Sequence, residues 1–201
     1  MSNKDRILAQ TLKVFLSQGI KATNMNDVAS SLGISKKTLY AHVDNKLDLV
    51  NQCFNLHIQN VESVLNQSIS QSQNAIDELF LIDANITTIM KQTNPFVLGE
   101  LRRFYPETWQ LYEHFKKNVL FKLFKDNLQN GIHQGLYRKE IDVDIISKLM
   151  LSRADVLIND DLFPLTKYNF FQLLMENKVY HIRGIGTQKG ITILEQKINE
   201  I

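Results

Sequence analysis

The sequence predicts an all-α chain in which an N-terminal three-helix helix-turn-helix head is followed by a larger helical domain. Its 201 residues include 8 Gly and 3 Pro, about 5% together against roughly 12% in an average protein, so turn-forming residues are too few for a many-stranded sheet. Apolar residues recur at helical spacing along most of the chain. Capping residues precede most of these apolar runs, which locates the individual helices.

The first two expected helices each end at a glycine. The first has one apolar face, formed by Ile7, Leu8, Leu12, Phe15 and Leu16. Gly19 follows it where a left-handed C-terminal cap is favoured. Asn24, with Asp27 three residues later, has the order of a capping box and opens a short second helix that Gly33 ends. The buried side of this second helix is expected to be Val28, Ala29 and Leu32.

Two further helices are expected to start before residue 50. Ser35 can cap a third helix that runs through Val43. Asn45, with Asp48 three residues later, begins a fourth helix that is expected to end near Leu65.

Beyond residue 65 the helical pattern is interrupted once and then resumes. The polar stretch 66–74 lacks periodicity and is expected to be a solvated turn or a frayed helix end. The later helices are expected at 75–92, 95–104, 106–131, 143–159, 166–182 and 187–199. The capping residues expected for four of them are Asn74, Asp142, Thr166 and Thr187.

Charge and cysteine content narrow the class of protein. The net charge is only +2, but residues 1–50 carry seven Lys or Arg against four Asp, so the N-terminal quarter is the basic end. The lone Cys53 excludes an intramolecular disulfide and a cysteine-based zinc site, as is typical of a cytoplasmic protein. Residues 4–18 are amphipathic rather than a signal peptide, and no apolar run is long enough for a membrane span.

The second and third helices have the features of a helix-turn-helix. Two helices that cross steeply need a small residue at their contact and a permissive residue in the turn, and Ala29 and Gly33 fill these places. The segment from Ser35 to Val43 is short, basic and free of carboxylates, as a helix in the major groove must be, because phosphates flank it. The residues expected to contact DNA from this segment are Ser35, Lys36, Lys37, Thr38 and Tyr40.

Helix N-termini at Asn24 and Lys46 offer a second kind of contact. Their free amides and positive dipole ends attract anions, so Asn24, Lys46 and the neighbouring Thr23 are expected to contact phosphates. Alternatively, Gly33 and the two adjacent lysines form an ordinary solvated turn, because Ala-x-x-x-Gly on its own is common.

The N-terminal segment contains a set of residues with a familiar order and spacing: Gly19, Ala22, Thr23, Asp27, Val28, Ala29, Leu32, Gly33, Ile34, Ser35, Thr38, Leu39, Tyr40, His42, Lys46, Leu47 and Leu49. Over about residues 4–50 this arrangement resembles the DNA-binding domain of the TetR family of bacterial transcriptional regulators. Val43 stands where Phe is commonest in the family, and Asn24 stands where Thr is commonest.

This resemblance implies a DNA-binding domain at residues 1–50, with His42 among its contact residues, and an effector-binding and dimerisation domain at 51–201. It implies a homodimeric repressor that a small-molecule effector releases from a palindromic operator. No enzymatic activity, metal or cofactor is expected, because the five His residues show no metal-binding spacing. A helical interaction protein and an all-α enzyme remain as alternatives.

Aromatic residues concentrated in the middle of the chain are candidates for an effector pocket. Trp109 and Tyr112 carry polar groups that could orient an apolar ligand. The full candidate set is Phe54, His57, Met90, Phe104, Trp109, Tyr112 and Phe115. The alternative is that these side chains form an ordinary core.

The segment 143–159 is apolar on two sides and therefore needs two packing partners. One partner could be a second subunit. The interface is expected to contain Ile146, Met150, Leu157, Phe170, Leu173 and Leu174. Packing of both sides within one subunit is the alternative. Gly184, Gly186 and Gly190 lack the strand and the Gly-Lys-Ser/Thr ending of a nucleotide loop and are expected to cap helices.

Overall fold

The computed structural model describes residues 2–94, 96–159, 161–164 and 166–200. Within these ranges the chain forms helices and turns, and no strand is present. The predicted all-α class is therefore confirmed. By its internal contacts the chain divides into two compact units, residues 1–63 with 89–115 (unit 1) and residues 64–88 with 116–201 (unit 2). The predicted boundary at residue 50 concerns the function of each part and stays a prediction.

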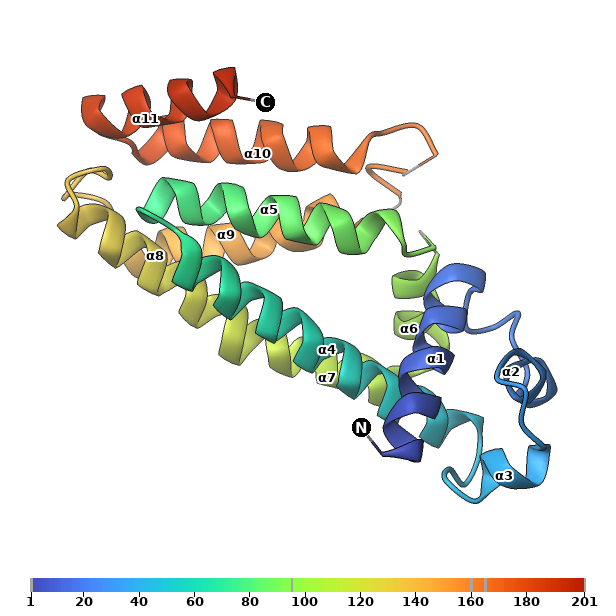
Figure 1. The fold of residues 1–201 in the computed structure, drawn as a ribbon. Coiled ribbons are helices and arrows are strands. Elements are labelled where there is room, and N and C mark those ends of the chain that lie inside the picture. The colour runs from blue at the N-terminus through green and yellow to red at the C-terminus, as the bar shows by residue number, and fades with distance from the viewer. Residues whose placement is uncertain (1, 95, 160, 165, 201) are drawn as a thin grey trace. The chain divides into compact units, whose positions relative to one another are not determined.

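Unit 1 combines the N-terminal helices with a later pair of helices (Figure 1). Its helices are α1 (Asn3–Gln18), α2 (Met25–Ser31), α3 (Lys36–Tyr40), α4 (Lys46–Gln71), α5 (Ala75–Lys91), α6 (Val97–Phe104) and α7 (Pro106–Phe115). Of these, α4 ends in unit 2, and α5 lies in unit 2 except for its last turn. One apolar cluster joins the head to α6, because Val97 and Leu101 pack with Phe15, Leu39 and Leu49. All five side chains are buried.

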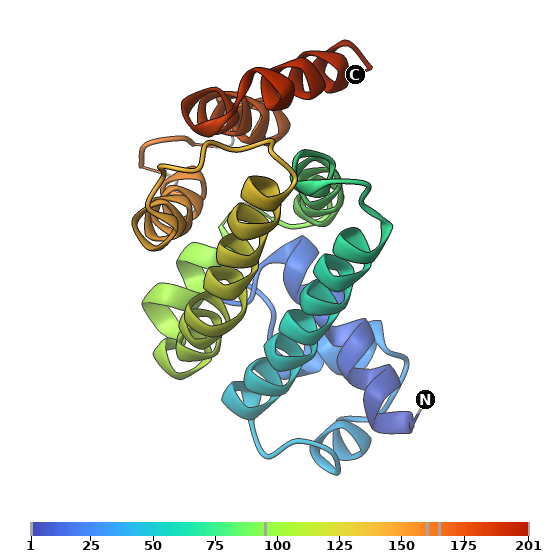
Figure 2. The ribbon, with the colours of Figure 1, turned by 90° about the vertical axis from the view of Figure 1, so that its left-hand side faces the viewer.

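Unit 2 is built from the remaining parts of α4 and α5 and the helices of the C-terminal half. These are a π-helical turn (Lys116–Leu120), α8 (Phe121–His133), α9 (Val143–Leu157), α10 (Phe170–Ile185) and α11 (Gln188–Asn199). Figures 1 and 2 both show α10 and α11 side by side. Tyr137 fills the core of this unit beside Gly131, where an added Cβ would lie 2.1 Å from the tyrosine ring.

Most predicted caps are confirmed because they depend on local hydrogen bonds. Asn74 Oδ1 accepts from the amides of residues 76 and 77. Asp142 and Thr187 cap α9 and α11 in the same way. The cap expected at Thr166 is wrong, because Asn169 caps α10 by accepting from the Gln172 amide.

The stretch 66–74, predicted to be a solvated turn or a frayed helix end, is mostly helix, because α4 continues to Gln71. Tertiary contacts explain the longer helix: Leu65 and Ser68 are buried, and the Ser68 hydroxyl accepts a hydrogen bond from Asn85 of α5 at 2.9 Å. The turn itself contains only residues 72–74.

Other predicted boundaries also change. The third helix ends at Tyr40 rather than Val43. The expected helix at 106–131 is interrupted by the π-helical turn. Residue 95, the expected start of another helix, lies outside the described residues, and α6 begins at Val97.

Candidate nucleic-acid interface

The turn between α2 and α3 has the geometry that a helix-turn-helix requires. Ala29 is 5% exposed, and its carbonyl accepts a hydrogen bond from the Ile34 amide at 3.1 Å. Gly33 has φ +64°, a backbone conformation that residues with a Cβ rarely adopt. An added Cβ would meet no atom within 4 Å, so conformation rather than space favours glycine at this position.

The third helix presents a polar surface and buries its apolar anchors. The Ser35 hydroxyl caps it by accepting from the Thr38 amide at 3.0 Å. Leu39 and Val43 are buried in the core of unit 1, whereas Lys36 and Lys37 are exposed. Of the other predicted contact residues on this segment, Ser35 and Tyr40 are exposed, and Thr38 and His42 are half-buried. No carboxylate lies between residues 35 and 43, so a basic face is open to an anionic partner.

The N-terminus of α2 is capped in a way that leaves one donor available. Asn24 Oδ1 accepts from the amides of Asn26 and Asp27, at 2.8 and 3.1 Å. The Asn24 amide in turn donates to Asp27 Oδ2 at 2.8 Å, which completes the capping box. Because Asn24 is exposed and its side-chain oxygen is occupied, its side-chain NH₂ is the group that can donate to a phosphate.

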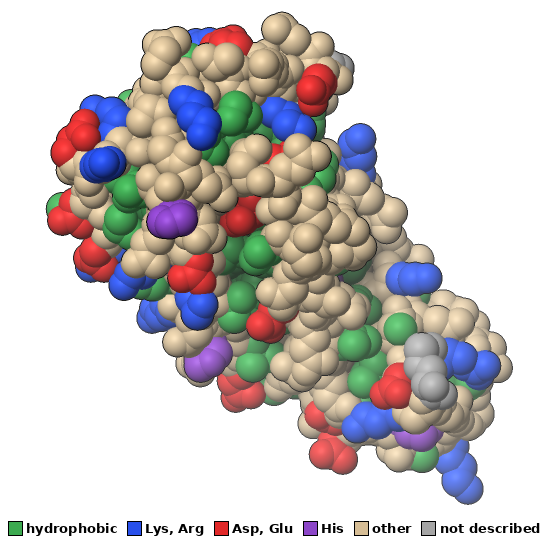
Figure 3. Space-filling model, turned by 60° about the vertical axis from the view of Figure 1, so that its left-hand side comes forward, with side chains coloured by type: hydrophobic (Ala, Val, Ile, Leu, Met, Phe, Trp, Pro, Cys, Tyr) green, Lys and Arg blue, Asp and Glu red, His purple; other side chains and the backbone are tan. Residues whose placement is uncertain are grey.

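Thr23 and Lys46 differ in how far they are accessible. Thr23 is 2% exposed, and its hydroxyl donates to the Gly19 carbonyl at 2.7 Å, which argues against a phosphate contact by its side chain. Lys46 is half-buried at the start of α4. Burial lowers its pKa, while the nearby carboxylates of Glu100 and Asp27 act in the opposite direction. Figure 3 shows Lys and Arg side chains on the surface of the N-terminal part, at the lower right.

Glu100, on α6, holds the turn between α1 and α2, a contact for which the sequence pattern carries no signal. Its Oε2 accepts hydrogen bonds from the amides of Ile20 and Lys21, at 2.6 and 3.0 Å. Just before α6, the Asn94 amide donates to the Leu16 carbonyl at 2.5 Å. Three backbone groups of the head therefore bond to α6 or to the residues directly before it.

The predicted effector-pocket residues all lie in unit 1. Phe54 and Phe115 are buried, and Phe54 belongs to the apolar cluster that supports the head. His57 contacts the Phe54 ring edge-on, and Trp109 lies 4.8 Å from Tyr112 between ring centroids. Met90 is half-buried, whereas Phe104 is 44% exposed with Lys21 over its ring. The pocket itself stays a prediction.

The predicted interface residues of α9 and α10 differ in accessibility. Met150 and Leu157 of α9 and Leu174 of α10 are buried, so these side chains pack within their own chain. Ile146, Phe170 and Leu173 are half-buried. The most exposed apolar side chains on these two helices are instead Ile145, Leu149, Val156 and Tyr180.

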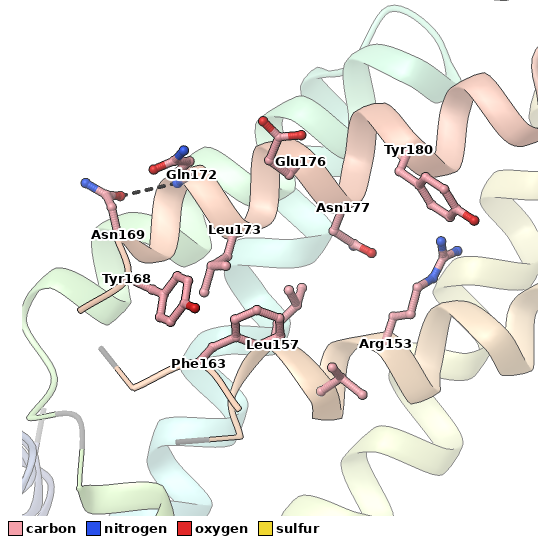
Figure 4. Close-up of a pocket in the computed structure, with 11 residues that line it drawn as sticks. Arg153, Leu157, Phe163, Tyr168, Asn169, Gln172, Leu173, Glu176, Asn177 and Tyr180 are labelled. Atoms are coloured by element: carbon pink, nitrogen blue, oxygen red, sulfur yellow. Dashed lines mark hydrogen bonds between the residues drawn. The ribbon is translucent and has the colours of Figure 1, made fainter. Parts of the chain in front are cut away.

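An open cavity of about 660 Å³ lies between α9 and α10 (Figure 4). Leu157, Leu173 and Tyr168 line its apolar part. None of the predicted effector-pocket residues lines it.

A metal centre or a membrane span would indicate a different class of protein. The described residues contain no group of three or more His, Cys, Asp or Glu side chains placed to hold a metal ion. No helix among them is both long and apolar enough to cross a bilayer.

Comparison with known proteins identifies the head and supports the fold. The family model of bacterial regulatory proteins of the tetR family matches residues 7–53. An uncharacterized HTH-type transcriptional regulator of Bacillus subtilis, YvaF, is 29% identical over 113 residues, which span 56% of this chain and 59% of that protein. The HTH-type transcriptional repressor KstR2 of Mycolicibacterium smegmatis is 24% identical over 152 residues, 74% of either chain.

Similarity of fold extends over most of the chain. The crystal structure of the transcriptional regulator FadR from Bacillus subtilis, in complex with stearoyl-CoA, superposes with a TM-score of 0.70. The superposition covers 90% of this chain and 98% of that one at 18% sequence identity. This likeness concerns the fold alone.

Proposed function

The chain belongs to the TetR family of bacterial regulatory proteins, and we propose that it is a cytoplasmic, homodimeric repressor that a small-molecule effector releases from a palindromic operator. The observation that carries this proposal is the exposed, carboxylate-free surface of α3, held by a turn with helix-turn-helix geometry. Such a surface suits the major groove of double-stranded DNA.

Each contact residue has a distinct role in this proposal. Lys36 and Lys37 bind phosphates or guanine acceptors, and Thr38 reads a base edge or a thymine methyl group. Tyr40 and the side-chain NH₂ of Asn24 bond phosphates and fix the register of the head. Two heads related by a two-fold axis then meet half-sites about one helical turn apart.

Effector release is proposed to act through α6. Glu100 bonds directly to the turn that precedes α2, and Asn94, just before α6, bonds to α1. Movement of α6 would therefore shift the head. The aromatic and half-buried groups of unit 1, including Trp109 and Tyr112, favour a largely apolar effector. The stearoyl-CoA bound to FadR is an example of a ligand with a long apolar chain. Coupling of this kind is a population shift worth about 1–3 kcal/mol.

Dimerisation is proposed to use α9 and α10. These helices expose Ile145, Leu149, Val156 and Tyr180, which a second copy would cover. Closed two-fold symmetry is the commonest arrangement of soluble oligomers.

Replacing Lys37 by alanine is expected to lower the affinity for the operator and to make that affinity less dependent on salt concentration. Each neutralised phosphate contributes about −0.9 to the slope of log affinity against log salt concentration, so a homodimer that loses one contact per head should have a slope shallower by about 1.8. The operator is first obtained by selecting bound fragments of genomic DNA. Titrations at several salt concentrations then compare Lys37→Ala with wild type.

Lys139→Ala is the matched control, because Lys139 is exposed but belongs to unit 2. Its slope should equal that of wild type. Selection that recovers no preferred sequence would overturn the proposed function.

A further inference from the structure

Arg153 of α9 is a half-buried cation without a counter-charge among the described residues. Its Nη2 lies 2.7 Å from Nδ1 of His181, on α10. No carboxylate of the described chain lies within ion-pair distance of its guanidinium, and its Nε is buried without a hydrogen-bond partner there. A buried guanidinium is costly unless an anion accepts its hydrogen bonds.

His181 orients Arg153 but does not neutralise it. Burial and the neighbouring Arg153 lower the pKa of His181 to about 4, so the ring is neutral at pH 7. A guanidinium only donates hydrogen bonds, so Nδ1 of His181 must be the acceptor and Nε2 carries the hydrogen. That Nε2 is also buried without a hydrogen-bond partner in the described structure.

The other charged side chains of α9 and α10 show which charges on these helices have no ion-pair partner. Within the described residues, Asp144 pairs with Lys148, Asp155 with Lys116, Lys178 with Asp83, and Arg183 with Glu195. Arg153 and Glu176 are the two charges of these helices that no ion pair within the described chain accounts for. They are opposite in sign and belong to opposite walls of one cavity.

Figure 4 shows Arg153 extending from α9 toward α10, with Asn177 and Tyr180 close to it and Glu176 directed away from it. Glu176 is exposed, so its carboxylate is accessible to another molecule. Val156, which lines the cavity, is exposed, and helical spacing places the exposed Ile145 and Leu149 on the same side of α9 as Arg153. One surface therefore offers an apolar row, an uncompensated cation and an accessible anion.

We propose that a second copy of this chain covers the cavity, and that Glu176 of each copy pairs with Arg153 of the other. Two-fold symmetry repeats every contact, so one protomer supplies both an acceptor and a donor and both charges are neutralised. A carboxylate matches the planar guanidinium and can accept two hydrogen bonds from it. This inference rests on the proposed homodimer and names the charge pair that gives its interface specificity.

Charge reversal tests the pair in the full-length protein. Arg153→Glu and Glu176→Arg each place like charges at both contacts, so each variant alone should dimerise at least about thirtyfold more weakly than wild type. An equimolar mixture of the two variants restores opposite charges at both contacts and should form a heterodimer. The double variant, with both substitutions in one chain, should form homodimers but should not pair with wild type. Sedimentation velocity measures each dissociation constant, and a tag on one component identifies the heterodimer.

Lys122→Glu is the control, because Lys122 is an exposed residue of α8 outside the cavity, and it should dimerise like wild type. Circular dichroism confirms that each variant is folded, and Glu176→Arg alters an exposed side chain that makes no ion pair within the described chain. A wild-type dimer whose single variants dimerise normally, or whose mixture remains monomeric, would overturn the charge pair and leave the homodimer standing. A monomeric wild type would overturn both.

Discussion

Replacement of Glu100 by alanine is expected to lower the free energy of unfolding by about 3 kcal/mol and to weaken operator binding. The carboxylate accepts hydrogen bonds from two backbone amides of the α1–α2 turn, those of Ile20 and Lys21. Hydrogen bonds to charged groups are worth about 1.5–3 kcal/mol each, and an unpaired buried donor adds its own cost. Ile20 is fully buried, so its amide has little access to water after the substitution. Because the turn leads directly to the α2 cap at Asn24, loosening it should also disorder the proposed phosphate contact of Asn24.

Urea denaturation and operator titration measure the two effects. Glu100→Gln is the matched control, since its amide oxygen can accept the same hydrogen bonds without the charge, and it should recover about half of the lost stability. A Glu100→Ala variant as stable as wild type would show that the two hydrogen bonds contribute nothing net.

The part of the fold that could be predicted from the sequence depends on contacts between near neighbours. Caps at Asn24, Asp142 and Thr187 bond amides two or three residues away, so the residue type and its place before an apolar run were sufficient. The turn at Gly33 is local in the same sense, because its positive φ is a property of one residue. Local signals of this kind are therefore enough to predict the helix-turn-helix.

Contacts between distant residues could not be predicted in this way. Glu100 meets Ile20 across 80 positions of sequence, and Arg153 meets His181 across 28. The extension of α4 likewise depends on Asn85, which bonds Ser68 from the next helix. Periodicity indicates that a helix has an apolar side but not which neighbour covers it.

Two features of the candidate sites also depend on tertiary contacts that the sequence pattern does not reveal. Thr23 has the residue type and position of a phosphate contact, yet its hydroxyl is used by Gly19 within the fold. On α9 the apolar pattern has two sides, and only packing shows that Met150 and Leu157 turn inward while Leu149 and Val156 remain exposed. The apolar pattern identified this helix as a candidate interface, and the side predicted for the interface, which carries Met150 and Leu157, is the inward one.

Acidification is expected to destabilise the protein through His181, by up to about 3 kcal/mol between pH 6.5 and pH 4. Burial and Arg153 lower the pKa of this histidine from 6.5 to about 4 in the folded state. The unfolded chain therefore binds a proton that the folded chain does not bind within this range. The stabilisation is complete above the unfolded pKa of 6.5 and is lost as the pH falls toward the folded pKa of about 4.

The measurement is the difference in free energy of unfolding between wild type and His181→Gln, followed by urea denaturation at a fixed protein concentration. Glutamine does not titrate, so carboxylates such as Asp83 affect both proteins alike and cancel in the difference. The advantage of wild type over His181→Gln should shrink as the pH falls. Arg153→Gln removes the positive neighbour of His181 while this histidine stays buried, so the folded-state pKa of His181 should lie closer to 6.5. The pH interval over which the stabilisation is lost should therefore be narrower. A difference that stays constant from pH 7 to about pH 4.5 would mean that His181 accepts a proton as readily in the folded chain as in the unfolded one.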